Sequence, residues 1–212
     1  MRDIPLFTTE NGMASLTLSE IPYKKTAYIR LQASQDPEAL LQECIDFCRA
    51  CGAEMVFATG HKILDDYSLH TEIWQMQCQR ALLPDTDAAL FPVQVETLEL
   101  WREHYNKRMM YVPNAATMTQ AAGEKLLKDG NGYFVHRGDT LLGIGIASSD
   151  RIDAVASLIP GSGREIVCAL NHALCGETVT VEVASENTRA VALYESLGFL
   201  KTVLISKWFQ VL

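Results

Sequence analysis

Apolar residues in the second half of the chain switch between the spacing of helices and that of strands. Apolar positions three to four residues apart predict a helix over 95–110, which Pro113 ends. The capping-box pattern at 117–120 opens a second helix that ends near Gly130. Alternating or continuous apolar runs predict strands at 132–137, 141–147, 152–158, 178–184 and 202–211, with helices at 163–174 and 188–197. The order ααβββαβαβ is that of a mixed α/β sheet covered by helices.

The first part of the chain carries the same two spacings in a shorter arrangement. Extended stretches at 14–20 and 26–33 predict a hairpin, and a helix follows that begins after Asp36 and ends before Gly52. Further strands are predicted at 54–59 and 69–78. Because the stretch 83–87 is rich in turn residues, we expect two domains, at 1–90 and 91–212.

The composition excludes several classes of function. The 212 residues are 48% hydrophobic, and 26 acidic against 18 basic side chains give a net charge of −8. Nucleic acid needs a basic face, so no nucleic-acid partner is expected. No apolar run approaches the ~18 residues of a membrane span, and the N-terminal stretch is not that of a signal peptide. Six cysteines are too few for a disulfide scaffold, so we expect a cytoplasmic protein.

The most informative segment is 181–199, VEVASENTRAVALYESLGF. Its residues predict a strand that ends at Ala184, a helix capped by Asn187, and a left-handed exit at Gly198. The segment resembles the signature of the GNAT superfamily of acyl-CoA-dependent N-acetyltransferases. The family's N-x-x-A-x-x-L-Y-x-x-x-G-F run is matched by Asn187, Ala190, Leu193, Tyr194, Gly198 and Phe199. The predicted order of elements over 95–212 also matches the family's order.

The resemblance implies a GNAT-like acyl-CoA N-acyltransferase fold and direct transfer of an acetyl group from acetyl-CoA to a small-molecule amine. In the family, backbone amides of a splayed strand pair hold the pantetheine arm. The corresponding edge here is Ala156, Ser157 and Leu158, with Asn187 nearby. The family often uses the tyrosine that matches Tyr194 as the acid for the departing thiolate, which suits a phenol with a pKa near ~10. The alternatives are that Tyr194 packs in an amphipathic helix and that Asn187 caps the helix without contacting a ligand.

The chain departs from the family at the loop that binds the coenzyme A diphosphate. The family's Q/R-x-x-G-x-G/A loop is represented only by PGSGRE at 160–165, without the basic residue that precedes the glycines. We expect the diphosphate to face Gly161, Ser162, Gly163 and Arg164. Ser162 and Glu165 also form an S-x-x-E capping-box pattern. That box would place the Glu165 carboxylate where a phosphate binds, or would merely cap a helix.

No motif identifies a general base. Asp153, on the strand before the loop, is one candidate, and Glu103 and His104 on the preceding helix are others; surface or packing roles explain each as well. The rival hypothesis is a GNAT-like protein without activity that binds an acyl-CoA or a partner protein. The last strand could also pair across a homodimer, although nothing in the sequence requires one.

The first part of the chain looks similar to a truncated, degenerate GNAT-like half, as in tandem members of the superfamily. It has no glycine loop and no N-x-x-A-x-x-L-Y run, so no catalysis is expected there. Its expected role is to extend the sheet or to wall the acceptor pocket.

Two patterns imitate other chemistry. Cys44, Cys48 and Cys51 have the spacing of an iron–sulfur motif, but they continue the apolar stripe of a predicted helix. We therefore expect core thiols and no metal site. Gly143 and Gly145 spell G-x-G inside a strand rather than before a helix. This context predicts a β-bulge or a close backbone approach instead of a dinucleotide site.

Overall fold

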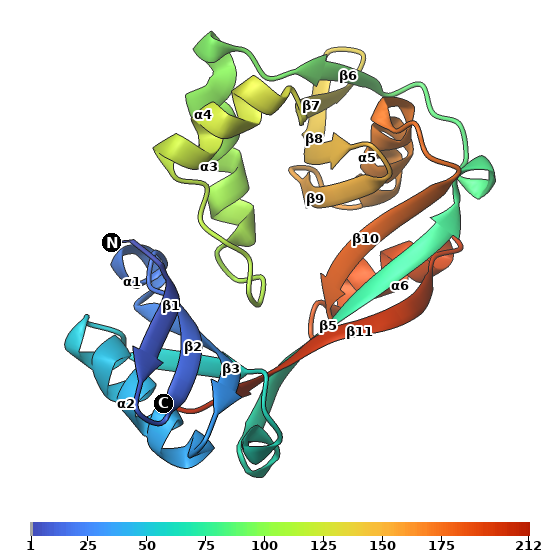
Figure 1. The fold of residues 1–212 in the computed structure, drawn as a ribbon. Helices are drawn as coiled ribbons and strands as arrows, with labels where there is room; N and C mark the ends of the chain where they lie inside the picture. The colour runs from blue at the N-terminus through green and yellow to red at the C-terminus, as the bar shows by residue number, and fades with distance from the viewer. Residues whose placement is uncertain (1) are drawn as a thin grey trace. The chain divides into compact units, whose positions relative to one another are not determined.

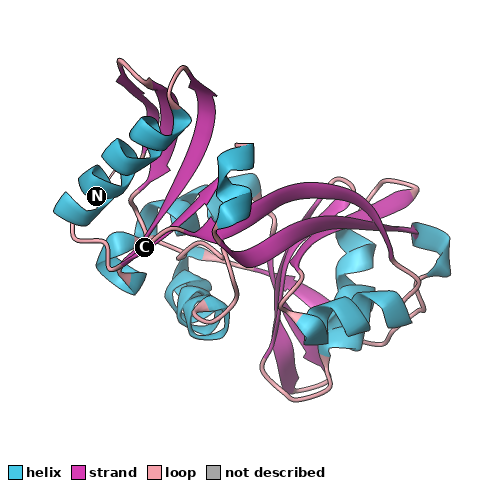
Figure 2. Cartoon of the chain, turned by 90° about the horizontal axis from the view of Figure 1, so that it is seen from below, coloured by secondary structure: helices cyan, strands magenta, loops and turns pink. Residues whose placement is uncertain are grey.

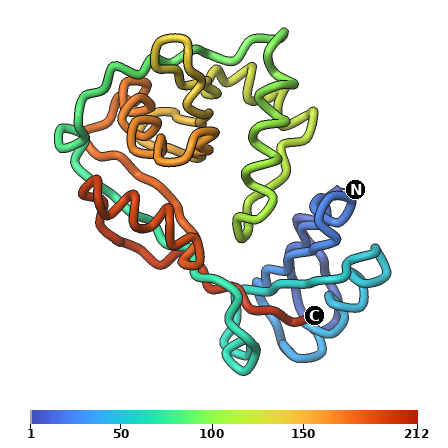
Figure 3. Tube along the Cα trace, turned by 180° about the vertical axis from the view of Figure 1, so that it is seen from behind, coloured from blue at the N-terminus to red at the C-terminus, as the bar shows by residue number. Residues whose placement is uncertain are grey.

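A computed structural model describes residues 2–212, which pack into two compact units. Unit 1 holds the residues up to Ile73 together with Leu204–Leu212, and unit 2 holds Trp74–Val203. Strands β5 (Ser68–Gln79) and β11 (Leu200–Gln210) therefore contribute residues to both units. Figure 3 shows the red C-terminal segment within unit 1. These bounds do not coincide with the division at residue 90 expected from the turn residues.

Unit 1 is a sheet with the order β1-β2-β3-β4-β11. Its first four strands are β1 (Ile4–Thr9), β2 (Gly12–Thr17), β3 (Thr26–Ser34) and β4 (Met55–Thr59). Neighbouring strands are antiparallel except β3 and β4, which are parallel. The hairpin predicted between β2 and β3 is present, and its connection is the one-turn helix α1 (Ile21–Lys24). Two 3-10 turns, η1 (Lys62–Asp66) and η2 (Arg80–Leu82), flank β5.

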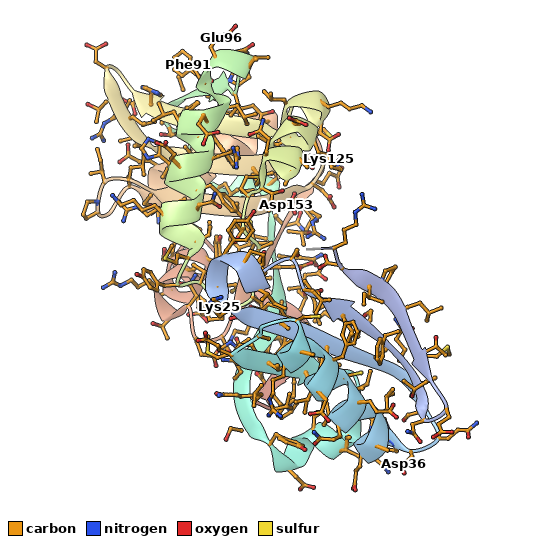
Figure 4. The ribbon with its side chains drawn as sticks, turned by 90° about the vertical axis from the view of Figure 1, so that its left-hand side faces the viewer. Lys25, Asp36, Phe91, Glu96, Lys125 and Asp153 are labelled. Atoms are coloured by element: carbon orange, nitrogen blue, oxygen red, sulfur yellow. The ribbon has the colours of Figure 1, made fainter. Side chains whose placement is uncertain are left out.

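One long helix, α2 (Pro37–Ala50), covers one face of this sheet. It begins where the Asp36 carboxylate, labelled in Figure 4, accepts a hydrogen bond from the Ala39 amide, as the sequence predicts. Cys51 is only half-buried, but the predicted core thiols are confirmed for Cys44 and Cys48, which are fully buried against the sheet. Burial raises the pKa of each of these two thiols to about 12.

Unit 2 has the strand order β11-β5-β10-β9-β8-β7-β6. Along the chain its elements are β6 (Ala89–Pro92), η3 (Val95–Thr97), α3 (Leu98–Met109), α4 (Gln120–Asp129), β7 (Gly132–Arg137), β8 (Thr140–Ser148), β9 (Arg151–Ser157), α5 (Gly163–Leu170), η4 (Asn171–Ala173), β10 (Thr178–Ala184) and α6 (Thr188–Ser196). The predicted mixed sheet covered by helices is confirmed. Strand β6 was not predicted, because it is short, largely exposed and contains Pro92.

Helices pack on both faces of the unit 2 sheet (Figures 1 and 2). Trp101 of α3 and Leu126 of α4 pack on the face that carries Phe134 and Ile144. Helix α5 packs on the opposite face, which carries Val135. Adjacent residues 134 and 135 point to opposite faces, as the alternation of a strand requires. The loop between β9 and α5 therefore leads from the sheet to its Val135 face, opposite to the face covered by α3 and α4.

Gly143 and Gly145 let α5 approach the backbone of β8. A Cβ atom at Gly145 would overlap the Leu170 side chain, and one at Gly143 would overlap the Ala156 carbonyl oxygen and lie 2.5 Å from Ile166 Cδ1. Ile166 and Leu170 are one helical turn apart, so they rest above glycines that are two strand positions apart. The structure confirms the predicted close approach, and a β-bulge also lies beside Gly143, because Val135 is opposite Gly143 and His136 is opposite Leu141.

Candidate functional site

Strands β9 and β10 are parallel but pair only near the start of β9. Arg151 lies opposite Thr180, and Ile152 lies opposite Val181. Among the described residues, no later position of β9 is paired with β10. On its other side β9 stays paired with β8 as far as Ser157, which lies opposite Gly143. The second half of β9 therefore has one edge whose backbone groups are not used by β10. Such an edge can hydrogen-bond an extended ligand in the manner of an added strand.

A β-bulge lies where the two strands separate. Ile146 of β8 lies opposite Ala154, while Ala147 lies opposite Ile152, so Asp153 is the extra residue of β9. The side chain of Asp153, labelled in Figure 4, accepts a hydrogen bond from Arg151 Nε at 3.2 Å. Arg151 also binds Glu182 at 3.1 Å. Asp153 is thus part of an exposed ion-pair network on β9 and β10.

The predicted capping box at the start of α5 is not formed, and that interpretation was wrong. Ser162 has helical backbone angles (φ −75°, ψ −5°) instead of the extended ones typical of an N-cap. Its single hydroxyl proton is instead shared between the carbonyls of Leu142 (3.0 Å) and Ile159 (2.8 Å). Glu165 does not reach back to the cap either, because its carboxylate pairs with Arg137 at 2.9 Å.

This arrangement leaves the N-terminus of α5 uncapped. The first helical hydrogen bond runs from the Ile166 amide to the Ser162 carbonyl. The amides of Gly163, Arg164 and Glu165 form no backbone hydrogen bond within residues 2–212, and no side chain caps them. Unbonded amides and the helix dipole favour an anion at such an end. Gly161, with φ of +88°, makes the left-handed turn into the helix with open space around it.

Helix α6 lies against the same loop. A Cβ atom at Gly163 would be 2.9 Å from Leu193 Cδ2 and 3.3 Å from Ser157 Oγ. Arg164, which is exposed, donates to the Ser196 carbonyl at 3.4 Å. The structure therefore brings the end of β9, the start of α5 and the second half of α6 together.

Leu158 connects the free edge of β9 to the loop. Its amide donates to the Leu142 carbonyl at 2.9 Å, so the strand's hydrogen bonding to β8 continues past the last strand residue. Its carbonyl accepts a hydrogen bond from Arg108 Nη2 of α3 at 3.0 Å. The two other residues expected at this edge differ in exposure, since the Ala156 side chain is buried in the core and Ser157 is half-buried.

Asn187 and Tyr194 occupy opposite ends of α6. The Asn187 side chain accepts a hydrogen bond from the Ala190 amide at 3.3 Å, which confirms the predicted cap. Tyr194 is only 7% exposed, and its ring packs 5.4 Å from that of Phe199. Burial raises the pKa of Tyr194 to about 12. Within residues 2–212 its hydroxyl has no hydrogen-bond partner.

Arg108 is the residue of α3 that contacts the loop, and the sequence did not single it out. Glu103 is exposed on the same helix and His104 is half-buried. Nothing in the local spacing of α3 distinguishes Arg108, because its partner Leu158 is 50 residues away along the chain.

The described residues hold neither a helix long and apolar enough to cross a membrane nor a group of three or more His, Cys, Asp or Glu side chains that could bind a metal ion.

Known proteins resemble this chain in structure rather than in sequence. No protein-family model matches it, and no curated protein does. A functionally unknown conserved protein from Staphylococcus epidermidis matches 97% of this chain over 92% of its own, with a TM-score of 0.63 and 11% identity. A putative acetyltransferase from Pyrococcus horikoshii matches 95% of this chain over 69% of its own, with a TM-score of 0.62 and 10% identity.

A tandem GNAT protein from the clavulanic acid biosynthesis pathway also matches. It covers 94% of this chain over 78% of its own length, with a TM-score of 0.53 and 11% identity. The chain has the GNAT fold. The fold predicted from the signature segment is thereby confirmed, and at these identities the similarity establishes the fold alone.

Proposed function

We propose that this protein is a cytoplasmic N-acetyltransferase that transfers the acetyl group of acetyl-CoA directly to a small-molecule amine. The observation that carries the proposal is the free edge of β9, which leads into the uncapped N-terminus of α5. An unpaired strand edge suits the amide groups of a pantetheine arm, and unbonded helix amides suit a diphosphate. Both features meet at the loop that follows Leu158.

In this proposal the edge formed by Ala156, Ser157 and Leu158 binds the pantetheine arm. Ser157 supplies the backbone groups for it, because the Leu158 amide already bonds Leu142 and the Leu158 carbonyl already bonds Arg108. The loop and first turn at 161–164 face the diphosphate, with Arg164 pairing with a phosphate oxygen. Ser162 has a supporting role there, because its hydroxyl is already bonded to two carbonyls that fix the loop. Asn187 keeps its side-chain NH₂ group for the pantetheine while its oxygen caps α6.

The chemistry requires a neutral amine that attacks the thioester carbonyl carbon, after which the carbon–sulfur bond breaks. The nitrogen loses a proton to water as the amide forms, and the thiolate takes up a proton from water to leave as the free thiol. Tyr194 then assists the departing thiolate. Because burial raises the phenol pKa to about 12, the hydroxyl stays protonated throughout the neutral range. A phenol that weak does not surrender its proton fully to a thiolate whose conjugate acid is near ~8.5. It therefore stabilises the developing charge by donating a hydrogen bond.

The proposal assigns this chemistry to unit 2 and treats unit 1 as a degenerate GNAT-like half. In unit 1 the parallel strands β3 and β4 stay paired at five successive positions, from Thr26 opposite Met55 to Arg30 opposite Thr59. Helix α2 begins with Asp36 and Pro37, so one amide is capped and another is missing. Among the described residues of unit 1, the β3–β4 pair therefore has no open edge and α2 has no uncapped end like those of unit 2. The similarity to a tandem GNAT protein supports the same view.

A second candidate function is a GNAT-like protein that binds acyl-CoA without turnover. Its support is that Tyr194 is buried and that Asp153, the carboxylate at the bulge, is held in an ion pair with Arg151. In this case the coenzyme would bind, but no amine would be acetylated.

Transfer to a panel of small amines tests the proposal and separates the two candidates. The full chain is mixed with acetyl-CoA and each amine, and both free thiol and acetylated product are measured by mass spectrometry. We expect the two products in equal amounts. Tyr194→Phe should lower kcat by about 10–100-fold with little change in KM. Tyr133→Phe is the matched control, because that hydroxyl bonds Gly130 away from the loop. Binding of acetyl-CoA without any acetylated amine would support the second candidate.

A further inference from the structure

The loop between β9 and α5 receives more positive charge than its own sequence provides. Arg164 is the basic residue that the segment 158–165 itself contains. Two further arginines reach this segment from other elements of unit 2. Arg108 of α3 donates to the Leu158 carbonyl at 3.0 Å, and Arg137 at the end of β7 pairs with Glu165 at 2.9 Å. Side chains distant in sequence thus converge on a loop that lacks the family's basic residue.

Arg108 retains most of its hydrogen-bonding capacity. A guanidinium has five N–H donors, and the bond to Leu158 uses one of them. The side chain is exposed, and among residues 2–212 it has no carboxylate partner. Arg102, six residues earlier on the same helix, differs because it is paired with Glu99. Arg108 is therefore both fixed in position and available to an anion.

Arg137 acts on the charge of the helix end. Glu165 is the acidic residue of the first turn of α5, where a free carboxylate would repel a bound phosphate. The ion pair with Arg137 draws this carboxylate toward β7 and neutralises it. Because the charges of Arg137 and Glu165 offset each other, Arg108 and Arg164 give this segment an excess of positive charge, on a chain whose net charge is −8.

We propose that Arg108 binds the phosphate groups of the coenzyme directly, as the cation that the loop sequence lacks, and that Arg137 supports this by neutralising Glu165. The inference rests on the proposed function, because it concerns the same coenzyme site. A guanidinium beside a carbonyl that precedes free helix amides can bind a phosphate oxygen through two of its remaining N–H groups. Phosphate affinity would then depend on α3 and β7 as well as on the loop.

The test compares coenzyme A with S-acetyl-pantetheine, which has the same thioester arm but no phosphates. Arg108→Gln is measured beside Lys107→Gln, an exposed neighbour on α3 with the same change of charge. We expect Arg108→Gln to raise the dissociation constant for coenzyme A by about 10-fold or more, as for a lost hydrogen bond to a charged group. Lys107→Gln should change it less than about 3-fold. Lys107→Gln should leave kcat/KM for S-acetyl-pantetheine unchanged, and Arg108→Gln should lower it much less than it lowers the affinity for coenzyme A, since Arg108 also holds the Leu158 carbonyl.

Two more variants test the charge argument. Arg108→Lys should keep part of the affinity, since an ammonium retains the charge but not the paired donors. Arg137→Gln should weaken coenzyme A binding, and adding Glu165→Gln should restore it, because the exposed carboxylate is then removed. Thermal melting of each variant shows whether it is folded.

The outcomes separate the inference from the proposed function. If the natural chain binds no coenzyme A, both are overturned. If it binds but Arg108→Gln and Lys107→Gln behave alike, the inference alone is wrong. The inference is also wrong if Arg108→Gln lowers the affinity for coenzyme A and kcat/KM for S-acetyl-pantetheine by the same factor. Arg108 would then only hold the loop in place through Leu158.

Discussion

The close approach of α5 to β8 makes the two glycines of β8 differ in how they tolerate a methyl group. In Gly145→Ala the new atom overlaps Leu170 Cδ1 and Cδ2, the ends of a side chain that can shift, and it lies 3.1 Å from the Ala154 carbonyl oxygen. In Gly143→Ala it meets the Ala156 carbonyl, which is backbone and is held in the β8–β9 ladder. We therefore expect Gly143→Ala to be the more damaging substitution.

The magnitudes follow from packing. Overpacking a core costs about 1–3 kcal/mol, and replacing a strand glycine by alanine returns about 0.5–1 kcal/mol. Gly145→Ala should lower the free energy of unfolding by about 1 kcal/mol, and Gly143→Ala by about 2 kcal/mol or more. Leu170→Ala alone should cost about 2–5 kcal/mol through the cavity it leaves. In the double variant Gly145→Ala/Leu170→Ala, the new methyl occupies part of that space.

Urea unfolding followed by circular dichroism measures all four variants. The double variant should be more stable than the sum of its two single changes by about 1 kcal/mol. Gly143→Ala should also weaken coenzyme A binding, because it displaces Ala156 at the free edge of β9. The reasoning is refuted if the double variant is additive, or if Gly143→Ala is no worse than Gly145→Ala.

Three further predictions concern helix ends and buried thiols. Asp36→Ala removes the cap of α2 and should lower the free energy of unfolding by about 1 kcal/mol in urea, whereas Asp36→Asn should retain most of it. Burial raises the pKa of Cys44 and Cys48 from 9.0 to about 12, so their stabilising effect is complete below pH 9 and is lost as the pH rises toward 12. The urea midpoint of the natural chain should fall between pH 8 and pH 10.5, and that of the Cys44→Ala/Cys48→Ala variant should fall less. Equal falls in the two proteins would contradict the assignment. Arg164→Glu should weaken coenzyme A binding by about 10-fold or more, while Lys128→Glu, the same charge change at the end of α4, should have little effect.

Local signals predicted the elements well. The strands predicted at 132–137 and 178–184 coincide with β7 and β10, and the helix predicted after Asp36 is α2. These elements have strong punctuation, because turn residues or caps bound them. The distribution of the strands between the units was not predictable in the same way, since it depends on Leu204–Leu212 folding with unit 1.

The site shows the same division between local and distant information. The Asn187 cap depends on residues three apart, and it was predicted. The capping box at Ser162 was expected from an equally local pattern, but it failed because the β8 carbonyl of Leu142 offers the hydroxyl another partner. Arg108 and Arg137 reach the loop across 50 and 28 residues of chain, so only the folded structure places them there.

Calorimetric titration of acetyl-CoA into the full chain tests the central claim most directly. We expect one binding site per chain with a micromolar dissociation constant. Acetyl-CoA at 100 times its dissociation constant should also raise the free energy of unfolding by about 2.7 kcal/mol. If millimolar acetyl-CoA produces neither heat nor a shift in melting temperature, the free edge of β9 and the open end of α5 do not form a coenzyme site.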